Sequence, residues 1–307
     1  MKAYNYDDIY LIPNKCVLTS RSNADTSVIL GKTQFKLPIV PANMSSTINS
    51  SWAQFLDMNG YFYIMHRFNN STVPFVEYAT KNNFNTISIS TGVGEESLLE
   101  LESIKGYKID YITIDIAHGH SESVAKQIAY IKTHFKNTYV IAGNIASNAA
   151  ARFLQDAGAD AIKVGIGSGV ICTTKLQTGF HIPMFTCITE CVDGVTCDVI
   201  ADGGIKYPGD VSKALVAGAT MVMAGGMFAG CSDSPAGMST LSQKSYHGST
   251  SLAAKGTNNH IEGRTVHLPL DVPLKEKLRD LTQALQSSIS YAGGTDLKAF
   301  NGVKWKC

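Results

Sequence analysis

The chain has 307 residues and a formal net charge of +1, with 44% hydrophobic and 17% charged residues. This composition excludes a disordered chain, and no Lys/Arg-dense stretch favours bulk attraction to nucleic acid or anionic lipid. No apolar run approaches the roughly 18 residues that span a bilayer, and no secretory signal is visible. Seven cysteines without framework spacing indicate reduced thiols. We therefore expect a cytoplasmic protein that binds neither nucleic acid nor membrane.

Short apolar runs recur along the chain with helix-length segments between them. They lie at 37–44, 61–67, 85–90, 111–119, 138–144, 161–167, 198–204 and 221–227. Each is continuously apolar, as parallel strands buried on both faces are. The segments 121–135, 148–160 and 208–220 have helical spacing instead. Eight β/α units predict an α/β fold, a single-domain TIM (β/α)8 barrel over residues 1–307.

Polar or glycine-rich residues follow nearly every predicted strand. They are Asn43, His66 and Arg67, Asp115 and His118, Gly143 and Asn144, Gly165 to Gly169, Asp202 to Gly204, and Gly225 and Gly226. The carboxyl ends of barrel strands meet at one rim, where barrel enzymes build their active sites. We therefore expect one site that draws on most of the strands.

Two regions fall outside the repeat. Residues 168–197, after the sixth strand, hold a loop and a predicted helix near 185–195. Residues 230–265, after the eighth strand, are rich in Gly, Ser, Thr and Asn. Long loops in compact domains are usually functional lids. We expect a catalytic loop in the first region and a mobile flap in the second.

Cys172 lies in the first region, within GIGSGVICTTKLQTG at 165–179. A lone cysteine is most often a buried structural thiol. Here Gly165, Gly167 and Gly169 allow close backbone approach, and Thr173 and Thr174 place hydroxyls beside the sulfur. These neighbours favour a nucleophilic cysteine over a structural one.

Two glycine pairs follow the last two predicted strands, in ADGGIKYPGD and MAGGMFAG. Each could simply turn the chain, but together they match the phosphate site of many barrels. Asp202, which precedes the first pair, could then accept hydrogen bonds from ribose hydroxyls. The segment DIAHGH could suggest a metal, but its ligands cannot easily converge on one ion. Cys187 and Cys191, four residues apart, are better explained by a core helix than by zinc.

Several long motifs resemble the IMP dehydrogenase and GMP reductase family. They are KVGIGSGVICTTKLQTG, IADGGIKYPGDVSKAL, MVMAGGMFAG and EGRTVHLP, and shorter ones extend the likeness to nearly the whole chain. No CBS regulatory insertion follows IMHRF, and residues 230–265 lack the Arg-Tyr pair that activates water in the dehydrogenases. The resemblance therefore implies the reductase reaction, in which NADPH reduces GMP to IMP and ammonia is released.

The resemblance also implies roles for individual residues. Cys172 would form a thioimidate with purine C2, while Thr174 and Glu262 carry the proton to departing ammonia. The residues implied to bind the nucleotide are Asp202, Gly203, Gly204, Gly225, Gly226, Gly248, Ser249 and Gly263. Those implied to bind NADPH are Ser20, Arg21, Arg67, Asp115, Ile116 and Ala117. The carbonyls of Gly167, Gly169 and Cys172 would hold a potassium ion, and the family suggests a homotetramer.

Val170 and Ser168 depart from the family pattern, which often has serine and proline at these positions. Two alternatives stay open at this stage: an IMP dehydrogenase without its regulatory domain, and a non-catalytic sensor of purine nucleotides.

Overall fold

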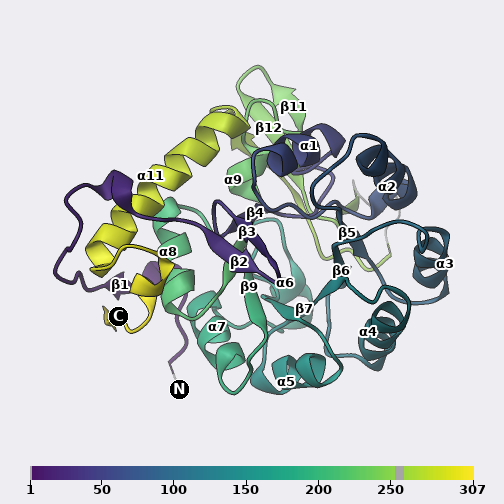
Figure 1. The fold of residues 1–307 in the computed structure, drawn as a ribbon, viewed down its shortest axis with the longest axis horizontal. Helices are drawn as coiled ribbons and strands as arrows, with labels where there is room; N and C mark the ends of the chain where they lie inside the picture. The colour runs from purple at the N-terminus through teal and green to yellow at the C-terminus, as the bar shows by residue number, and fades with distance from the viewer. Residues whose placement is uncertain (1, 253–258) are drawn as a thin grey trace.

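A curled parallel sheet forms the centre of the molecule (Figure 1). The structure is a computed structural model that describes residues 2–252 and 259–307. The sheet order is β4-β10-β9-β8-β7-β6-β5. The strands are β4 (Ile39–Pro41), β5 (Ser88–Thr91), β6 (Tyr111–Asp115), β7 (Tyr139–Ile145), β8 (Ala161–Val164), β9 (Asp198–Asp202) and β10 (Met221–Ala224). The predicted α/β class is confirmed, and seven of the eight predicted strands form this sheet.

The predicted strand at 61–67 is wrong as a regular strand. Within this segment only Met65 forms a β-bridge, to Ile89 of β5, and the Ser90 hydroxyl donates to the Met65 carbonyl at 2.7 Å. Phe62 and Ile64 nevertheless point into the sheet's inner core. The apolar pattern of the segment reflects this burial, which does not require a ladder of backbone hydrogen bonds.

Helices follow the strands and surround the sheet (Figure 1). They are α1 (Ser50–Met58), α2 (Thr72–Lys81), α3 (Glu95–Ser103), α4 (Glu122–His134), α5 (Asn148–Asp156), α7 (Met184–Val192), α8 (Pro208–Val216) and α11 (Leu274–Ala292). The predicted helices at 121–135, 148–160 and 208–220 are confirmed as α4, α5 and α8. The last two end early because Gly158 and Gly218, with φ of 101° and 108°, leave the helical conformation. No helix in the described ranges is long and apolar enough to cross a membrane.

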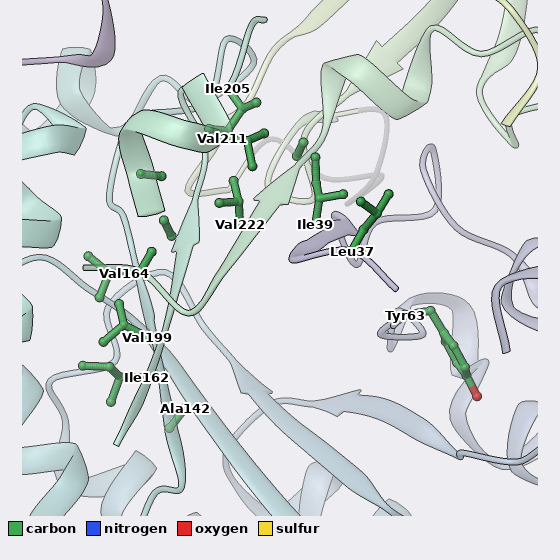
Figure 2. Close-up of a cluster of buried hydrophobic side chains, with 14 of the residues drawn as sticks. Leu37, Ile39, Tyr63, Ala142, Ile162, Val164, Val199, Ile205, Val211 and Val222 are labelled. Carbon is green, nitrogen blue, oxygen red and sulfur yellow. The ribbon is translucent and has the colours of Figure 1, made fainter. Parts of the chain in front are cut away.

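The hydrophobic core has an inner and an outer part. Inside the curled sheet, Tyr111, Ile141 and Met223 pack with other strand residues. The hairpin of β2 (Val28–Leu30) and β3 (Thr33–Phe35) covers the amino ends of the strands, where Tyr111 donates to the Leu30 carbonyl at 2.8 Å. The outer part lies between the sheet and the helices and contains Val164 (Figure 2). With one end packed and covered, the carboxyl ends of the strands are left for a site.

The predicted flap at 230–265 is in part a folded sheet. After the short helix α9 (Gly226–Ala229), the chain forms β11 (Gly237–Thr240), β12 (Gln243–His247) and β13 (Thr265–Pro269), which pair antiparallel. Lys244 and Tyr246 are buried while their neighbours in β12 are less so, an alternation typical of a strand. The expectation of one long loop is therefore wrong, and residues 253–258 of the predicted flap lie outside the described residues. Its mobility stays a prediction.

Smaller elements complete the fold. They are the strands β1 (Tyr10–Leu11) and β14 (Trp305–Lys306), which pair near the two ends of the chain, the helix α6 (Thr174–Thr178), and the 3-10 helices η1 (Tyr6–Asp8), η2 (Arg21–Asn23), η3 (Phe68–Asn70) and η4 (Leu297–Phe300).

Candidate active site

The loop after β8 is pressed against the loop after β9. Gly165 has a φ of 139°, and a Cβ at this position would lie 2.1 Å from the Asp202 carbonyl oxygen. The Ser168 hydroxyl donates to the same carbonyl at 3.0 Å. A side chain at residue 165 would force the two loops apart, so glycine is required here by a close backbone approach.

Three side chains from two distant segments form a chain of hydrogen bonds. The Cys172 thiol donates to Thr174 Oγ1 at 3.2 Å, and the Thr174 hydroxyl donates to Glu262 Oε2 at 2.6 Å. Glu262 is held by its backbone, since its carbonyl accepts from Thr173 N at 2.8 Å. We name this arrangement the Cys172–Thr174–Glu262 relay. The relay connects a thiol to a carboxylate through one hydroxyl, and a connection of this kind allows a proton to pass from a nucleophile to a base.

The segment after the flap is fastened to the catalytic loop beside this relay. Cys172 and Gly263 form an antiparallel β-bridge, and Arg264 N donates to the Ile171 carbonyl at 2.9 Å. The Arg264 guanidinium also donates twice to the Val170 carbonyl, at 3.1 and 3.0 Å. These backbone contacts explain how residues 90 positions apart along the chain can share one site.

A buried lysine joins two strand ends on the other side of the site. The Lys163 ammonium lies 2.7 Å from Asp115 Oδ1 and 2.6 Å from Asp202 Oδ2. Asn144 Nδ2 donates to the same Asp202 oxygen at 2.8 Å. Burial opposes the charge on Lys163, but the two carboxylates raise its pKa above the ordinary lysine value. Burial likewise opposes ionisation of Asp115, yet Lys163 holds the pKa of Asp115 below its usual range. Lys163 and Asp115 are therefore both charged at neutral pH.

The two predicted glycine pairs follow neighbouring strands, β9 and β10, and Gly203 N donates to the Met223 carbonyl at 3.3 Å. Gly203 and Gly204 have φ of 101° and 77°, which favours glycine at both positions. A Cβ on Gly225 would lie 1.9 Å from the Tyr246 hydroxyl oxygen. Burial, with Asp202 and Cys172 nearby, raises the pKa of Tyr246 well above the ordinary tyrosine value, so its hydroxyl stays protonated and able to donate.

A cavity of about 1270 Å³ opens at this rim. Most of the predicted site residues line it, namely Arg67, Asp115, Ile116, Ala117, Gly167, Gly169, Cys172, Thr174, Asp202, Gly203, Gly204, Gly225, Gly226, Gly248, Ser249 and Gly263. Glu262 reaches it through Thr174. Ser20 and Arg21 do not line it: Ser20 caps η2, and the Arg21 guanidinium donates to Ser287 of α11 at 3.3 Å. The structure thus brings predicted residues that follow four strands of the sheet, β6, β8, β9 and β10, to one cavity together with Arg67 and the segment after β12, and it leaves Ser20 and Arg21 outside.

Sequence reasoning missed Lys163 and Tyr246. Lys163 is the single charged residue within the apolar run AIKVGIG, and a charge in a strand buried on both faces needs a buried partner. The sequence therefore indicated that Lys163 has buried partners. It did not indicate which residues these partners are, because Asp115 and Asp202 are remote from Lys163 in the sequence. Cys187 and Cys191 are both buried in α7, as the core-helix interpretation predicted.

The fold and the clustering of these groups at the carboxyl rim of the strands define an α/β-barrel enzyme. A family model described as IMP dehydrogenase / GMP reductase domain matches residues 3–304. A GMP reductase of Helicobacter pylori strain G27 is 49% identical over 99% of this chain and 96% of its own length. GMP reductases of Enterococcus faecalis and Streptococcus equi subsp. equi are each 45% identical over 99% of this chain, covering 96% and 95% of their lengths. The chain belongs to the IMP dehydrogenase / GMP reductase family.

Proposed function

We propose that this protein catalyses the NADPH-dependent reductive deamination of GMP to IMP. The observation that carries the proposal is the Cys172–Thr174–Glu262 relay, which links a thiol to a carboxylate through one hydroxyl. The full-length similarity to GMP reductases supports the choice of substrate. The seven free thiols are consistent with the cytoplasmic location that we propose for it.

The nucleotide would bind between the loops after β8, β9 and β10. Asp202 Oδ2 is occupied by Lys163 and Asn144, which leaves Oδ1 to accept from ribose hydroxyls. Gly203, Gly204, Gly225 and Gly226 would let the phosphate approach the backbone, and Gly248, Ser249 and Gly263 line the cavity near Cys172. This arrangement would direct purine C2 toward the thiol.

The relay provides a path for the proton that moves from the thiol to the departing ammonia. The Cys172 sulfur attacks C2 of GMP, and the thiol proton passes through Thr174 to Glu262. The C2–N bond then breaks, and the same proton returns through Thr174 to the amino group, which leaves as ammonia. The product on the enzyme is a thioimidate between Cys172 and C2. General acid–base catalysis of this type contributes roughly 10²–10⁴-fold.

A bound NADPH would supply the hydride that reduces C2, and Cys172 would then leave C2 as a thiolate as IMP is released. The residues that would hold the cofactor are Arg67, Asp115, Ile116 and Ala117. They fit this role because the cavity is larger than the roughly 300–1,000 Å³ of typical ligand pockets, and because Arg67 Nε is buried without a partner among the described residues. Ser20 and Arg21 have no assigned role in this proposal, and the homotetramer stays a prediction.

The proposal includes a monovalent cation, potassium, held by backbone carbonyls of Gly167, Gly169 and Cys172. Neutral carbonyl oxygens suit a hard cation of low charge. Gly167 has a φ of 73°, so the loop turns sharply at this residue. The Gly169 carbonyl already accepts from Cys172 N at 3.0 Å, and its second lone pair is available for an ion.

The test is NADPH oxidation, followed by absorbance, with GMP as substrate. The wild-type protein is expected to consume NADPH and release one ammonia per IMP formed, and Cys172→Ala is expected to abolish turnover. Cys16→Ala is the matched control, because Cys16 is an exposed thiol far from the relay in the sequence. Oxidation of IMP with NAD and no reaction with GMP would assign a dehydrogenase instead. Tight nucleotide binding without any turnover would assign a sensor.

A further inference from the structure

Lys163 is the one strand residue of this site whose charge the proposed chemistry leaves unused. It is 2% exposed, although a buried ammonium normally costs stability unless it is fully paired. Its two partners belong to different halves of the site. Asp202 faces the proposed ribose position, whereas Asp115 lies among the residues proposed for the cofactor.

The strand register explains how one lysine can reach both carboxylates. Lys163 of β8 is paired with Gly143 of β7, and Gly143 is paired with Asp115 of β6. The three residues therefore lie in one row across the sheet. A Cβ on Gly143 would lie 2.7 Å from Lys163 Cβ and 2.6 Å from the Lys163 carbonyl oxygen. The missing side chain at residue 143 is what lets the lysine extend across β7 to Asp115.

The hydrogen bonds also fix which oxygen of Asp202 remains free. Lys163 and Asn144 both donate to Oδ2, and among the described residues no donor contacts Oδ1. Asn144 donates in addition to the Gly165 carbonyl at 2.8 Å, which ties the same carboxylate to the catalytic loop. The orientation of Asp202 therefore depends on Lys163 and Asn144 together.

We propose that Lys163 is a positioning residue: its ammonium lies between Asp115 and Asp202, holds both carboxylates in place, and so couples the ribose subsite to the cofactor subsite. This inference rests on the proposed function, since it assigns the two subsites by the ligands of that reaction. Without the ammonium, two carboxylates that shared one nitrogen would face each other and repel. One would take up a proton or turn away, and Asp202 would lose its fixed acceptor.

Other ionisable groups face this cluster and belong in any account of its pH dependence. Arg67 approaches Asp115 from the loop after residues 61–66 and favours its ionised form. Tyr246 from β12 and Tyr6 from η1 face Asp202, and Cys172 faces Tyr246. The pKa values of both tyrosines are raised by burial, so at neutral pH neither carries a charge. Lys163 and Arg67 are thus the cations that balance the two carboxylates.

The test measures GMP affinity by calorimetry without NADPH, so that it does not depend on turnover. We expect Lys163→Met to weaken GMP binding by roughly 10- to 100-fold, the value of one hydrogen bond to a charged group. The ratio of variant to wild-type Kd should increase from pH 6 to pH 8, because the proton that one of the two carboxylates takes up in the variant is lost over this range. Lys163→Arg, which keeps the charge, should recover most of the affinity.

A double variant separates electrostatic positioning from packing. In Lys163→Met with Asp115→Asn, the repulsion on Asp202 is removed, so GMP should bind more tightly than to Lys163→Met alone. Asp115→Asn in the wild-type background should not tighten binding. The matched control is Lys132→Met, because Lys132 pairs with Asp160 at the amino end of the same strand, β8, and it should leave GMP affinity unchanged.

Several outcomes would overturn the inference. They are wild-type affinity in Lys163→Met, a double variant no tighter than the single one, and a Kd ratio that does not change with pH. If Lys163→Met does not fold, recovery of folding and GMP binding on adding Asp115→Asn supports the inference, and failure of both variants to fold counts against it. A wild-type protein that binds neither GMP nor IMP would refute the proposed function itself, whereas normal wild-type binding with unaffected variants refutes only the role of Lys163.

Discussion

Replacing Thr174 by valine tests the relay with little change in shape. Thr174 is the first residue of α6, and its hydroxyl both accepts from Cys172 and donates to Glu262. Valine keeps the branched side chain but removes the oxygen. The thiol and the carboxylate are then no longer connected by a path for the proton, while the backbone contact between Thr173 and Glu262 remains.

The expected loss follows from what the hydroxyl does. A positioned acid–base group contributes roughly 10²–10⁴ in rate, which is about 2.7–5.4 kcal/mol of barrier. We therefore expect kcat for GMP reduction to decrease by that factor in Thr174→Val. The affinity for IMP should change little, because IMP lacks the amino group that the relay serves. The free energy of unfolding should also change little, since the lost bonds are partly exposed.

The assay is NADPH oxidation with GMP, run beside ammonia release and IMP binding by calorimetry. Thr178→Val provides the matched control, because Thr178 lies four residues later in α6 and its hydroxyl donates to the Thr174 carbonyl at 2.7 Å, outside the hydrogen bonds of the relay. It should retain close to wild-type activity. If Thr174→Val kept more than about a tenth of wild-type kcat, the relay would not be the route of the proton, since even the weakest acid–base catalysts contribute more.

Three further predictions concern the sheet, the packing of a helix and a buried charge. Gly143→Ala places a Cβ 2.7 Å from Lys163 Cβ, so it should weaken GMP binding measured by calorimetry. Unchanged affinity would contradict the inference that the Lys163 side chain reaches Asp115 by extending across β7 at Gly143. Leu154→Ala in α5 removes a side chain that is 0% exposed and should lower the free energy of unfolding in urea by about 2–5 kcal/mol, whereas Leu99→Ala, at 65% exposure, should change it by less than about 0.5 kcal/mol. The pKa of Asp115 is lowered in the folded protein, so its ionised form contributes stability above about pH 4. This contribution is lost as the pH falls through the pKa of Asp115 in the folded protein. The difference in melting temperature between wild type and Asp115→Asn should therefore be constant from about pH 5 to 9 and should disappear below about pH 4. A difference that changed near neutral pH would contradict this sign.

The strands and helices of the barrel could be predicted because their burial is periodic in the sequence. The runs that became β6, β7 and β8 are mostly apolar and are buried along most of their length, whereas α4 buries one face only. The prediction was wrong at 61–67, where Phe62 and Ile64 are buried as in a strand but lack the backbone pairing. It was wrong again at 230–265, where polar composition concealed the alternation of Lys244 and Tyr246 in β12.

Part of the site could be predicted because some of its reactive side chains lie within a few residues of one another in the sequence. Cys172 and Thr174 are two residues apart, so a thiol beside a hydroxyl was visible in the sequence. Asp202 stood next to the glycines that require unusual backbone angles. In contrast, Ser20 and Arg21 were assigned by resemblance alone, and within this chain they lie outside the cavity.

The α/β class and the strand ends that carry the polar groups could be predicted from the amino-acid sequence, because both depend on local composition and on the period of burial. Which of these groups meet depends on the three-dimensional fold. Glu262 reaches Thr174 because backbone hydrogen bonds hold the segment after the flap against the catalytic loop. Lys163 reaches Asp115 and Asp202 because the strand register places Gly143 between them. Contacts of this kind depend on how remote strands pair, and no local pattern of residues specifies that pairing.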